Sequence, residues 1–144
     1  MSTEQNKALV RRVIEEVISR GNMSVADELV ALDWVGHPVP PGIPPGREGL
    51  KLVVTMYRSA FPDMKTTIHD IIAEGDKVAI RMTHSATHKG EFMGIPPTGK
   101  SVSFGEISIL RFAEGKNVEF WGQTDNMGMM QQLGVIPAPG QSGS

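Results

Sequence analysis

A glutamate and a histidine interrupt apolar sequence in the second half of the chain, and they are the residues best suited to acid–base chemistry. Glu106 lies in the segment 101–113 and His84 in the segment 77–88. A charged group among apolar side chains is costly to bury unless it is paired, and polar interruptions of an apolar surface are typical of small-molecule sites. We expect Glu106 to act as a base and His84 to donate a hydrogen bond to developing charge, or the two to satisfy each other. If the strand register slips at Gly105, Glu106 faces water instead.

Two further histidines could belong to the same site. His88 follows His84 by four residues, and His37 lies in a long proline-rich loop that could close the mouth of a pocket. The alternatives are that His88 only shapes the next loop and that His37 is exposed. Four strand residues span about 13 Å, so His84 and His88 cannot share one metal ion, and we expect no metal site. The chain has no cysteine and no Gly-x-Ser-x-Gly elbow, which argues against a nucleophilic triad.

Residues 94–101 match the phosphate-loop pattern G-x-x-x-x-G-K-[ST]. A phosphate loop holds its ligand with consecutive backbone N–H groups and with the N-terminus of the helix that follows. Pro96 and Pro97 lack that N–H, and residues 101–112 alternate as a strand does. We therefore interpret the match as a loop between two strands that binds no nucleotide.

The first half of the chain has helical spacing. Apolar residues recur at that spacing over 9–18, and a short second helix follows over 24–30. Residues 35–46 contain five prolines and three glycines and predict a long loop. A third helix over 50–61 carries Tyr57.

The second half changes to the period of strands. The predicted strands are residues 65–73, 77–88, 101–113 and 117–124. The tight turns between them favour antiparallel hairpins, and Asp125 is placed to cap a last short helix. Helices followed by strands indicate an α+β fold. We predict a cone-shaped α+β barrel, in which three helices pack on one face of a curved antiparallel sheet and leave a cavity.

Alternation along each strand assigns the side chains that face this cavity. On the last strand, Val118, Phe120 and Gly122 are predicted to point inward, while Asn117 and Trp121 point outward. The residues that we expect to contact a substrate, besides Glu106 and His84, are His37, Tyr57, Met82, His88, Phe104, Ser108, Phe120 and Gly122. The lining indicates an apolar ligand of medium size.

Composition sets the remaining expectations. The chain has 144 residues, 40% of them hydrophobic, and a net charge of −2, which gives no reason to expect a nucleic acid or membrane partner. The N-terminus does not resemble a signal peptide, so we expect a cytoplasmic protein. We expect a single domain over residues 1–136 and a disordered tail over residues 137–144, where Pro, Gly and Ser are frequent.

Several segments resemble the SnoaL-like polyketide cyclase family of the nuclear transport factor 2-like superfamily. The matching segments are Ala60–Asp63, Glu74–Val78, Thr87–Lys100 with its Gly-Ile-Pro-Pro-Thr-Gly run, Trp121 with Asp125, and Gln132–Gly134. The resemblance covers about residues 5–136. It implies an α+β barrel, commonly a homodimer formed through the sheet, that binds a polyketide-like substrate. It also implies ring closure by intramolecular aldol condensation without metal or cofactor.

The chain departs from the family pattern where the family places its base. That aspartate falls on Gly122, and the glutamine and histidine of the preceding strand fall on Glu106 and Ser108. One hypothesis is a cyclase whose base has moved to Glu106, or a related isomerisation or epoxide opening. A second is a non-catalytic module that binds a small apolar molecule, and a third is a dimeric interaction protein.

Overall fold

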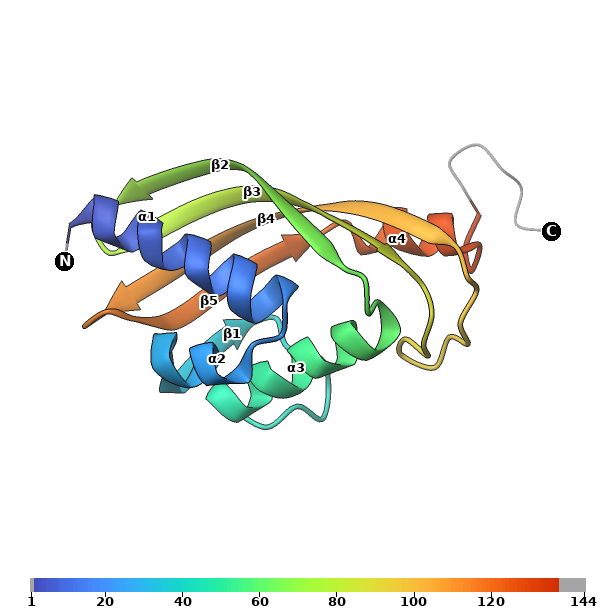
Figure 1. The fold of residues 1–144 in the computed structure, drawn as a ribbon, viewed down its shortest axis with the longest axis horizontal. Helices are drawn as coiled ribbons and strands as arrows, with labels where there is room; N and C mark the ends of the chain where they lie inside the picture. Colours follow the sequence, from blue (N-terminus) through green and yellow to red (C-terminus); the bar gives the residue numbers. More distant parts are fainter. Residues whose placement is uncertain (1, 138–144) are drawn as a thin grey trace.

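The computed structural model describes residues 2–137. Helices come first and most strands follow, as Figure 1 shows. The elements are α1 (Thr3–Arg12), η1 (Val13–Ser19), α2 (Met23–Leu29), β1 (Val30–His37), α3 (Arg47–Ala60), β2 (Lys65–Glu74), β3 (Lys77–Thr87), β4 (Ser101–Ala113), β5 (Lys116–Thr124) and α4 (Asn126–Leu133). The predicted α+β fold is confirmed, and the four predicted strands begin and end within one residue of the observed ones.

Local sequence explains where the first and last helices begin and end. Ser2 and Gln5 form a reciprocal capping box at the start of α1, which continues into the π-helical segment η1. Asp125 caps α4 by accepting a hydrogen bond from the backbone N–H of Gly128 at 2.9 Å. Gly134, at φ +80°, ends α4 in the left-handed conformation that glycine adopts readily. The tail predicted for residues 137–144 lies outside the described residues except for Pro137.

The sheet has five strands in the order β1-β5-β4-β3-β2. Strands β2 to β5 form the predicted antiparallel meander, and the sheet curves over α1, α2 and α3 on one side (Figure 1). The fifth strand, β1, pairs with β5 in parallel at the edge. It lies in a stretch that the sequence assigned to a helix end and a loop, so the sheet is mixed rather than wholly antiparallel.

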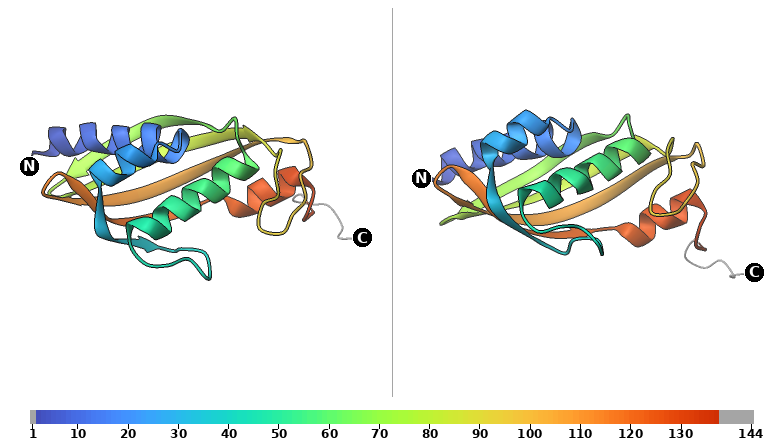
Figure 2. Two further views of the ribbon diagram at one scale, coloured as in Figure 1. Left: turned by 60° about the horizontal axis from the view of Figure 1, so that its bottom comes forward. Right: turned by 90° about the horizontal axis from the view of Figure 1, so that it is seen from below.

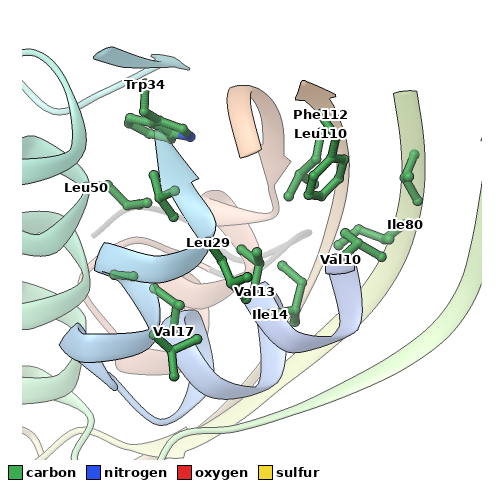
Figure 3. Packing of buried hydrophobic residues seen from close by; sticks show 14 of the residues in the cluster. Val10, Val13, Ile14, Val17, Leu29, Trp34, Leu50, Ile80, Leu110 and Phe112 are labelled. Atoms are coloured by element: carbon green, nitrogen blue, oxygen red, sulfur yellow. The ribbon is translucent and has the colours of Figure 1, made fainter. Parts of the chain in front are cut away.

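The core lies between the helices and the inner face of the sheet and has two parts. The larger cluster packs α1, η1 and α2 against β3, β4 and β1; Figure 3 shows Val10, Ile14 and Leu29 beside Ile80 and Leu110. The second cluster includes Phe61, Phe92, Phe104 and Met129 and joins the C-terminal end of α3 to α4. Figure 2 shows α4 and the loop after β3 at that end, opposite the N-terminus.

The segment that matched the phosphate loop belongs to this connection. Phe92 and Ile95 exchange backbone hydrogen bonds of 3.0 and 2.8 Å, and the backbone N–H groups of Lys89 and Gly90 donate to the carbonyl of Ala60. The chain enters β4 directly at Ser101. The segment is therefore a loop between strands, as predicted, and it fixes the end of α3.

A bulge at the start of β5 overturns part of the predicted alternation. Asn117 was expected to face outward but is buried, and Val118 was expected to face inward but is only half-buried. The register shifts between Arg111 and Phe112, which leaves Val118 between paired residues and turns Asn117 toward the core. There its Oδ1 accepts a hydrogen bond from the indole of Trp34 on β1 at 3.0 Å.

None of the helices over residues 2–137 has both the length and the apolar content needed to cross a membrane.

Candidate active site

Glu106 lies at the middle of β4, on the inner face of the sheet. The register pairs it with Met82 of β3 and Thr124 of β5, and its side chain is 12% exposed. The slip at Gly105 that would turn Glu106 to water does not occur, because β3 and β4 pair without interruption. The alternation that placed this carboxylate among apolar side chains is therefore correct.

Two side chains hold the carboxylate. His84 Nε2 lies 2.9 Å from Oε1 of Glu106, and the hydroxyl of Ser108 donates to Oε2. Within residues 2–137, Glu106 forms no ion pair with a lysine or arginine, and its one charge-capable partner is His84. Each carboxylate oxygen keeps a lone pair, so the group remains able to accept a proton from a ligand.

His84 is fixed at both ring nitrogens. Its Nδ1 lies 2.8 Å from the hydroxyl of Thr66 on β2, and its ring lies 5.3 Å from that of Phe104. In the tautomer in which Nδ1 accepts from that hydroxyl, Nε2 carries a proton that it donates to Glu106. The sequence did not single out Thr66. Its alternation along β2 was the signal that could have placed it beside His84.

Gly122 lies on β5 directly opposite Ser108, next to the carboxylate. A Cβ atom at Gly122 would lie 3.5 Å from Oε2 of Glu106, 3.3 Å from Oγ of Ser108 and 2.7 Å from Cε1 of Phe120. A side chain at position 122 would therefore reach into the space that the carboxylate of Glu106 occupies.

Tyr57 lies on α3 and packs against the second core cluster. Its ring packs on Phe92 at 5.2 Å and on Phe61 at 6.5 Å, which directs it into the second core cluster. Burial raises the pKa of the Tyr57 phenol, and the negative charge of Glu106 raises it further. The phenol therefore stays protonated and is close enough to sense the carboxylate.

Apolar side chains surround these polar groups. Met82 and Phe104 are buried on β3 and β4, and Phe120 is half-buried on β5, packing at 6.3 Å from Trp34. The structure thus brings together Glu106, His84, Ser108, Gly122 and the predicted apolar residues. Two open surface hollows of about 350 and 370 Å³ lie elsewhere, beside Arg58 and beside Asn6. The apolar cavity itself stays a prediction.

His88 is fully buried beyond His84 on β3. Its Nδ1 accepts a hydrogen bond from the backbone N–H of Thr98 at 3.2 Å, and its ring lies 5.4 Å from Phe61. In the neutral ring the proton is therefore on Nε2, which has no partner among the described residues. His88 shapes the loop that follows β3, which is one of the two alternatives predicted for it. Its Nε2 also remains a buried donor without a partner among the described residues.

His37 does not join the site. It lies on β1, where its Nε2 is 2.8 Å from Glu119 and its ring stacks on Trp121 at 5.5 Å. Trp121 pairs with the exposed Ile109, so this group lies on the outer face of the sheet. The expected loop histidine that would close a pocket is instead a strand residue directed away from Glu106, because residues 30–37 form a strand.

Comparison with known proteins identifies the family of the chain. The model of the SnoaL-like polyketide cyclase family matches residues 8–133. The chain belongs to this family. It is 28% identical over 138 residues to aklanonic acid methyl ester cyclase DnrD of Streptomyces peucetius, which covers 93% of the chain and 92% of DnrD.

Two solved structures of Streptomyces proteins are also similar. IdmH of Streptomyces antibioticus, proposed to be a polyketide cyclase, is 36% identical with a TM-score of 0.78, over 90% of the chain and 99% of IdmH. AclR of Streptomyces galilaeus, proposed to be a hydroxylase, is 31% identical with a TM-score of 0.80, over 95% of the chain and 85% of AclR. The SnoaL-like scaffold is therefore established, while the names of these relatives differ in the reaction.

Proposed function

We propose that this SnoaL-like protein binds a polyketide-like small molecule on the inner face of its sheet and closes a ring by cofactor-free proton abstraction, with Glu106 as the base. The observation that carries the proposal is the 3.5 Å between Oε2 of Glu106 and the Cβ position of Gly122. The resemblance implies that the family's aspartate falls on Gly122, and Glu106 would then supply a carboxylate beside the place where that acid would stand.

The reaction balances without a further reactant. Glu106 removes a proton from the carbon next to a carbonyl, and the electron pair moves onto the carbonyl oxygen as an enolate. The enolate carbon attacks a second carbonyl of the same molecule, which forms a C–C bond and an alkoxide. The alkoxide takes the proton back from Glu106, and the product is an isomer of the substrate.

The neighbours of Glu106 prepare it for this role. The proton on Nε2 of His84 fixes Oε1, and the hydroxyl of Ser108 fixes Oε2. These hydrogen bonds hold the carboxylate in one orientation, which lowers the entropic cost of reaching a reactive geometry. With no cationic side chain paired to it among residues 2–137, the carboxylate keeps its charge available for the substrate proton.

The same pairing supports a second candidate function. His84 and Glu106 satisfy each other, as a structural pair in a binding module would, and Gly122 then widens the space for an apolar ligand. The two functions differ in one measurable respect. An enzyme exchanges the acidic C–H protons of a bound polyketide with solvent, whereas a binding module retains them.

We also propose that the chain pairs with a second copy through the outer face of its sheet. Ile107 and Ile109 of β4 are exposed there, beside the stacked rings of His37 and Trp121. Apolar side chains at the centre of an exposed sheet face are typical of a protein interface.

The first test of the function is turnover of a defined compound. Aklanonic acid methyl ester, the compound in the name of DnrD, is the starting probe because that relative aligns over nearly the whole chain. Incubation in D₂O followed by mass spectrometry separates the outcomes. Deuterium incorporation or a cyclised isomer supports an enzyme. Binding by native mass spectrometry without either change supports the binding module.

A further inference from the structure

Abstraction of a proton next to a carbonyl places negative charge on the carbonyl oxygen, and a hydrogen-bond donor aimed at that oxygen supplies much of the rate. Polar side chains near Glu106 could supply that donor. This inference rests on the proposed function, because it concerns the oxygen of the same substrate.

The two nearest donors are already committed. His84 uses Nε2 for Glu106 and Nδ1 for Thr66, so neither ring nitrogen is free for a ligand. The hydroxyl of Ser108 donates its single proton to Oε2 of Glu106. These residues orient the base and provide no hydrogen-bond donor for the substrate oxygen.

His88 has a free donor in the wrong place. Its Nε2 has no partner among the described residues, but His88 follows His84 by four strand residues, about 13 Å. A donor at that distance serves a remote part of a long ligand. It does not reach the oxygen adjacent to the carbon that Glu106 deprotonates.

Tyr57 combines a free donor with the right place. Its ring packs on Phe61 and Phe92, and its hydroxyl has no hydrogen-bond partner among residues 2–137. The cluster that holds the ring also contains Phe104, which lies against His84. Helix α3 covers the inner face of the sheet (Figure 2), and the charge of Glu106 on that face raises the pKa of the Tyr57 phenol.

We propose that Tyr57 is a catalytic residue whose phenol donates a hydrogen bond to the substrate oxygen that gains negative charge when Glu106 removes the proton. Base and donor then lie on opposite walls, Glu106 on the sheet and Tyr57 on the helix. The substrate lies between them, with its acidic C–H toward β4 and its carbonyl toward α3.

The chain offers a selective probe, because Tyr57 is its single tyrosine. Growth on 3-fluorotyrosine replaces this one residue, lowers the pKa of its phenol and leaves its shape nearly unchanged. The charged or titratable groups on the elements around the ring include Glu106 on β4, His84 on β3 and His88 directly after it, and Arg58 on α3, whose guanidinium donates to backbone carbonyls of Ser19 and Met64. The same elements also carry Arg47, Glu48 and Lys51 on α3, Lys77 and Arg81 on β3, and Arg111 on β4. A change confined to the phenol therefore reports on Tyr57.

The test measures turnover of aklanonic acid methyl ester against pH for the wild type, Tyr57→Phe and the fluorotyrosine protein. We expect Tyr57→Phe to lower kcat about 100- to 1,000-fold with little change in KM. We expect the fall in kcat at high pH to move to lower pH in the fluorotyrosine protein. Turnover by Tyr57→Phe within about twofold of wild type, with the same pH profile, overturns the role of Tyr57 and leaves Glu106 as the base.

If neither the wild type nor any variant turns the ester over, that result counts against the proposed function itself. A binding measurement then still tests the role of Tyr57. The probe is 2-naphthol, an apolar molecule with one acidic oxygen. We expect its binding to shift the ¹⁹F resonance of fluorotyrosine 57 and expect Tyr57→Phe to weaken its affinity about tenfold. Binding of 2-naphthol without either effect overturns the donor role of Tyr57.

Discussion

The Cβ position of Gly122 lies 3.5 Å from Oε2 of Glu106. A carboxylate in this place could therefore extend from either of two neighbouring strands, β4 or β5. The resemblance to the family implies that its acid extends from position 122, which lies on β5. In this chain it extends from β4, where it is held by His84 and Ser108. We therefore propose that the position of the charge is kept while the residue that supplies it changes.

Restoring an acid at position 122 tests this exchange. Gly122→Asp alone places two carboxylates side by side, which forces one of them to hold a proton at neutral pH and lowers activity. In a Glu106→Gln background, the new aspartate is the single carboxylate at these two positions. We expect the rate of deuterium exchange to be about tenfold higher than with Glu106→Gln alone. Gly122→Ala is the control, because it adds the Cβ that approaches Phe120 without a charge. A double variant no better than Glu106→Gln would mean that position 122 does not address the same substrate atom.

Asn117 ties the parallel edge strand to the meander, and its removal is expected to destabilise the fold. Its side chain accepts from Trp34 and donates to the carbonyls of Arg111 and Glu119 at 3.0 Å each. Asn117→Ala leaves these buried groups without partners, so we expect a loss of about 2–4 kcal/mol in urea unfolding. Gln123→Ala, at an exposed position of the same strand, is expected to change stability by less than about 0.5 kcal/mol. Equal effects of the two substitutions would contradict the structural role of Asn117.

The sequence predicted the meander well because period-two alternation is a local signal. Met82, His84, Glu106 and Ser108 face inward as their spacing required. The same spacing gave the wrong face for Asn117. The bulge at Val118 adds one residue to β5, so the side chains that precede it in the strand point to the opposite face from the one that alternation predicts. A bulge is set by how two strands fit together, which neither strand shows alone.

β1 was missed for a different reason. Its residues adjoin a run rich in proline and glycine, and the pattern of that run extends into the strand. What makes residues 30–37 a strand is the parallel pairing with β5 and the Trp34–Asn117 hydrogen bond, both formed with residues more than 80 positions away. The position of His37 on the outer face follows from the same long-range pairing.

Asp63 gives the protein a predictable acid sensitivity. Its carboxylate accepts from the backbone N–H of Thr87 at 2.8 Å and from the hydroxyl of Thr87 at 2.7 Å, and the backbone hydrogen bond is the main reason why its pKa is lowered. A group with a lowered folded-state pKa stabilises the fold above its unfolded pKa and loses that contribution as the pH falls through the folded one. Asp63→Asn is therefore less stable than the wild type at pH 7, and the difference shrinks below about pH 4. Thermal unfolding at several pH values measures this, with the exposed Asp33→Asn as control; a difference that is constant with pH would contradict it.

A charge on the outer face is expected to separate the proposed dimer. Ile109→Asp buries a carboxylate in an apolar contact if two sheets meet there, which disfavours association. Light scattering after gel filtration should show a dimer for the wild type and a monomer for Ile109→Asp. Met127→Asp, which charges an exposed apolar residue on α4, should remain dimeric. A wild type that is monomeric at all concentrations would contradict the proposal.

The central claim is that Glu106 is the base of a proton-abstracting SnoaL-like enzyme, and deuterium exchange into a bound polyketide tests it most directly. Aklanonic acid methyl ester in D₂O is incubated with the wild type, with Glu106→Gln and with Glu74→Gln, a matched change at an exposed glutamate. We expect rapid incorporation with the wild type and with Glu74→Gln, and a rate about 100- to 10,000-fold lower with Glu106→Gln. Incorporation by Glu106→Gln at the wild-type rate would show that another group removes the proton and would contradict the account.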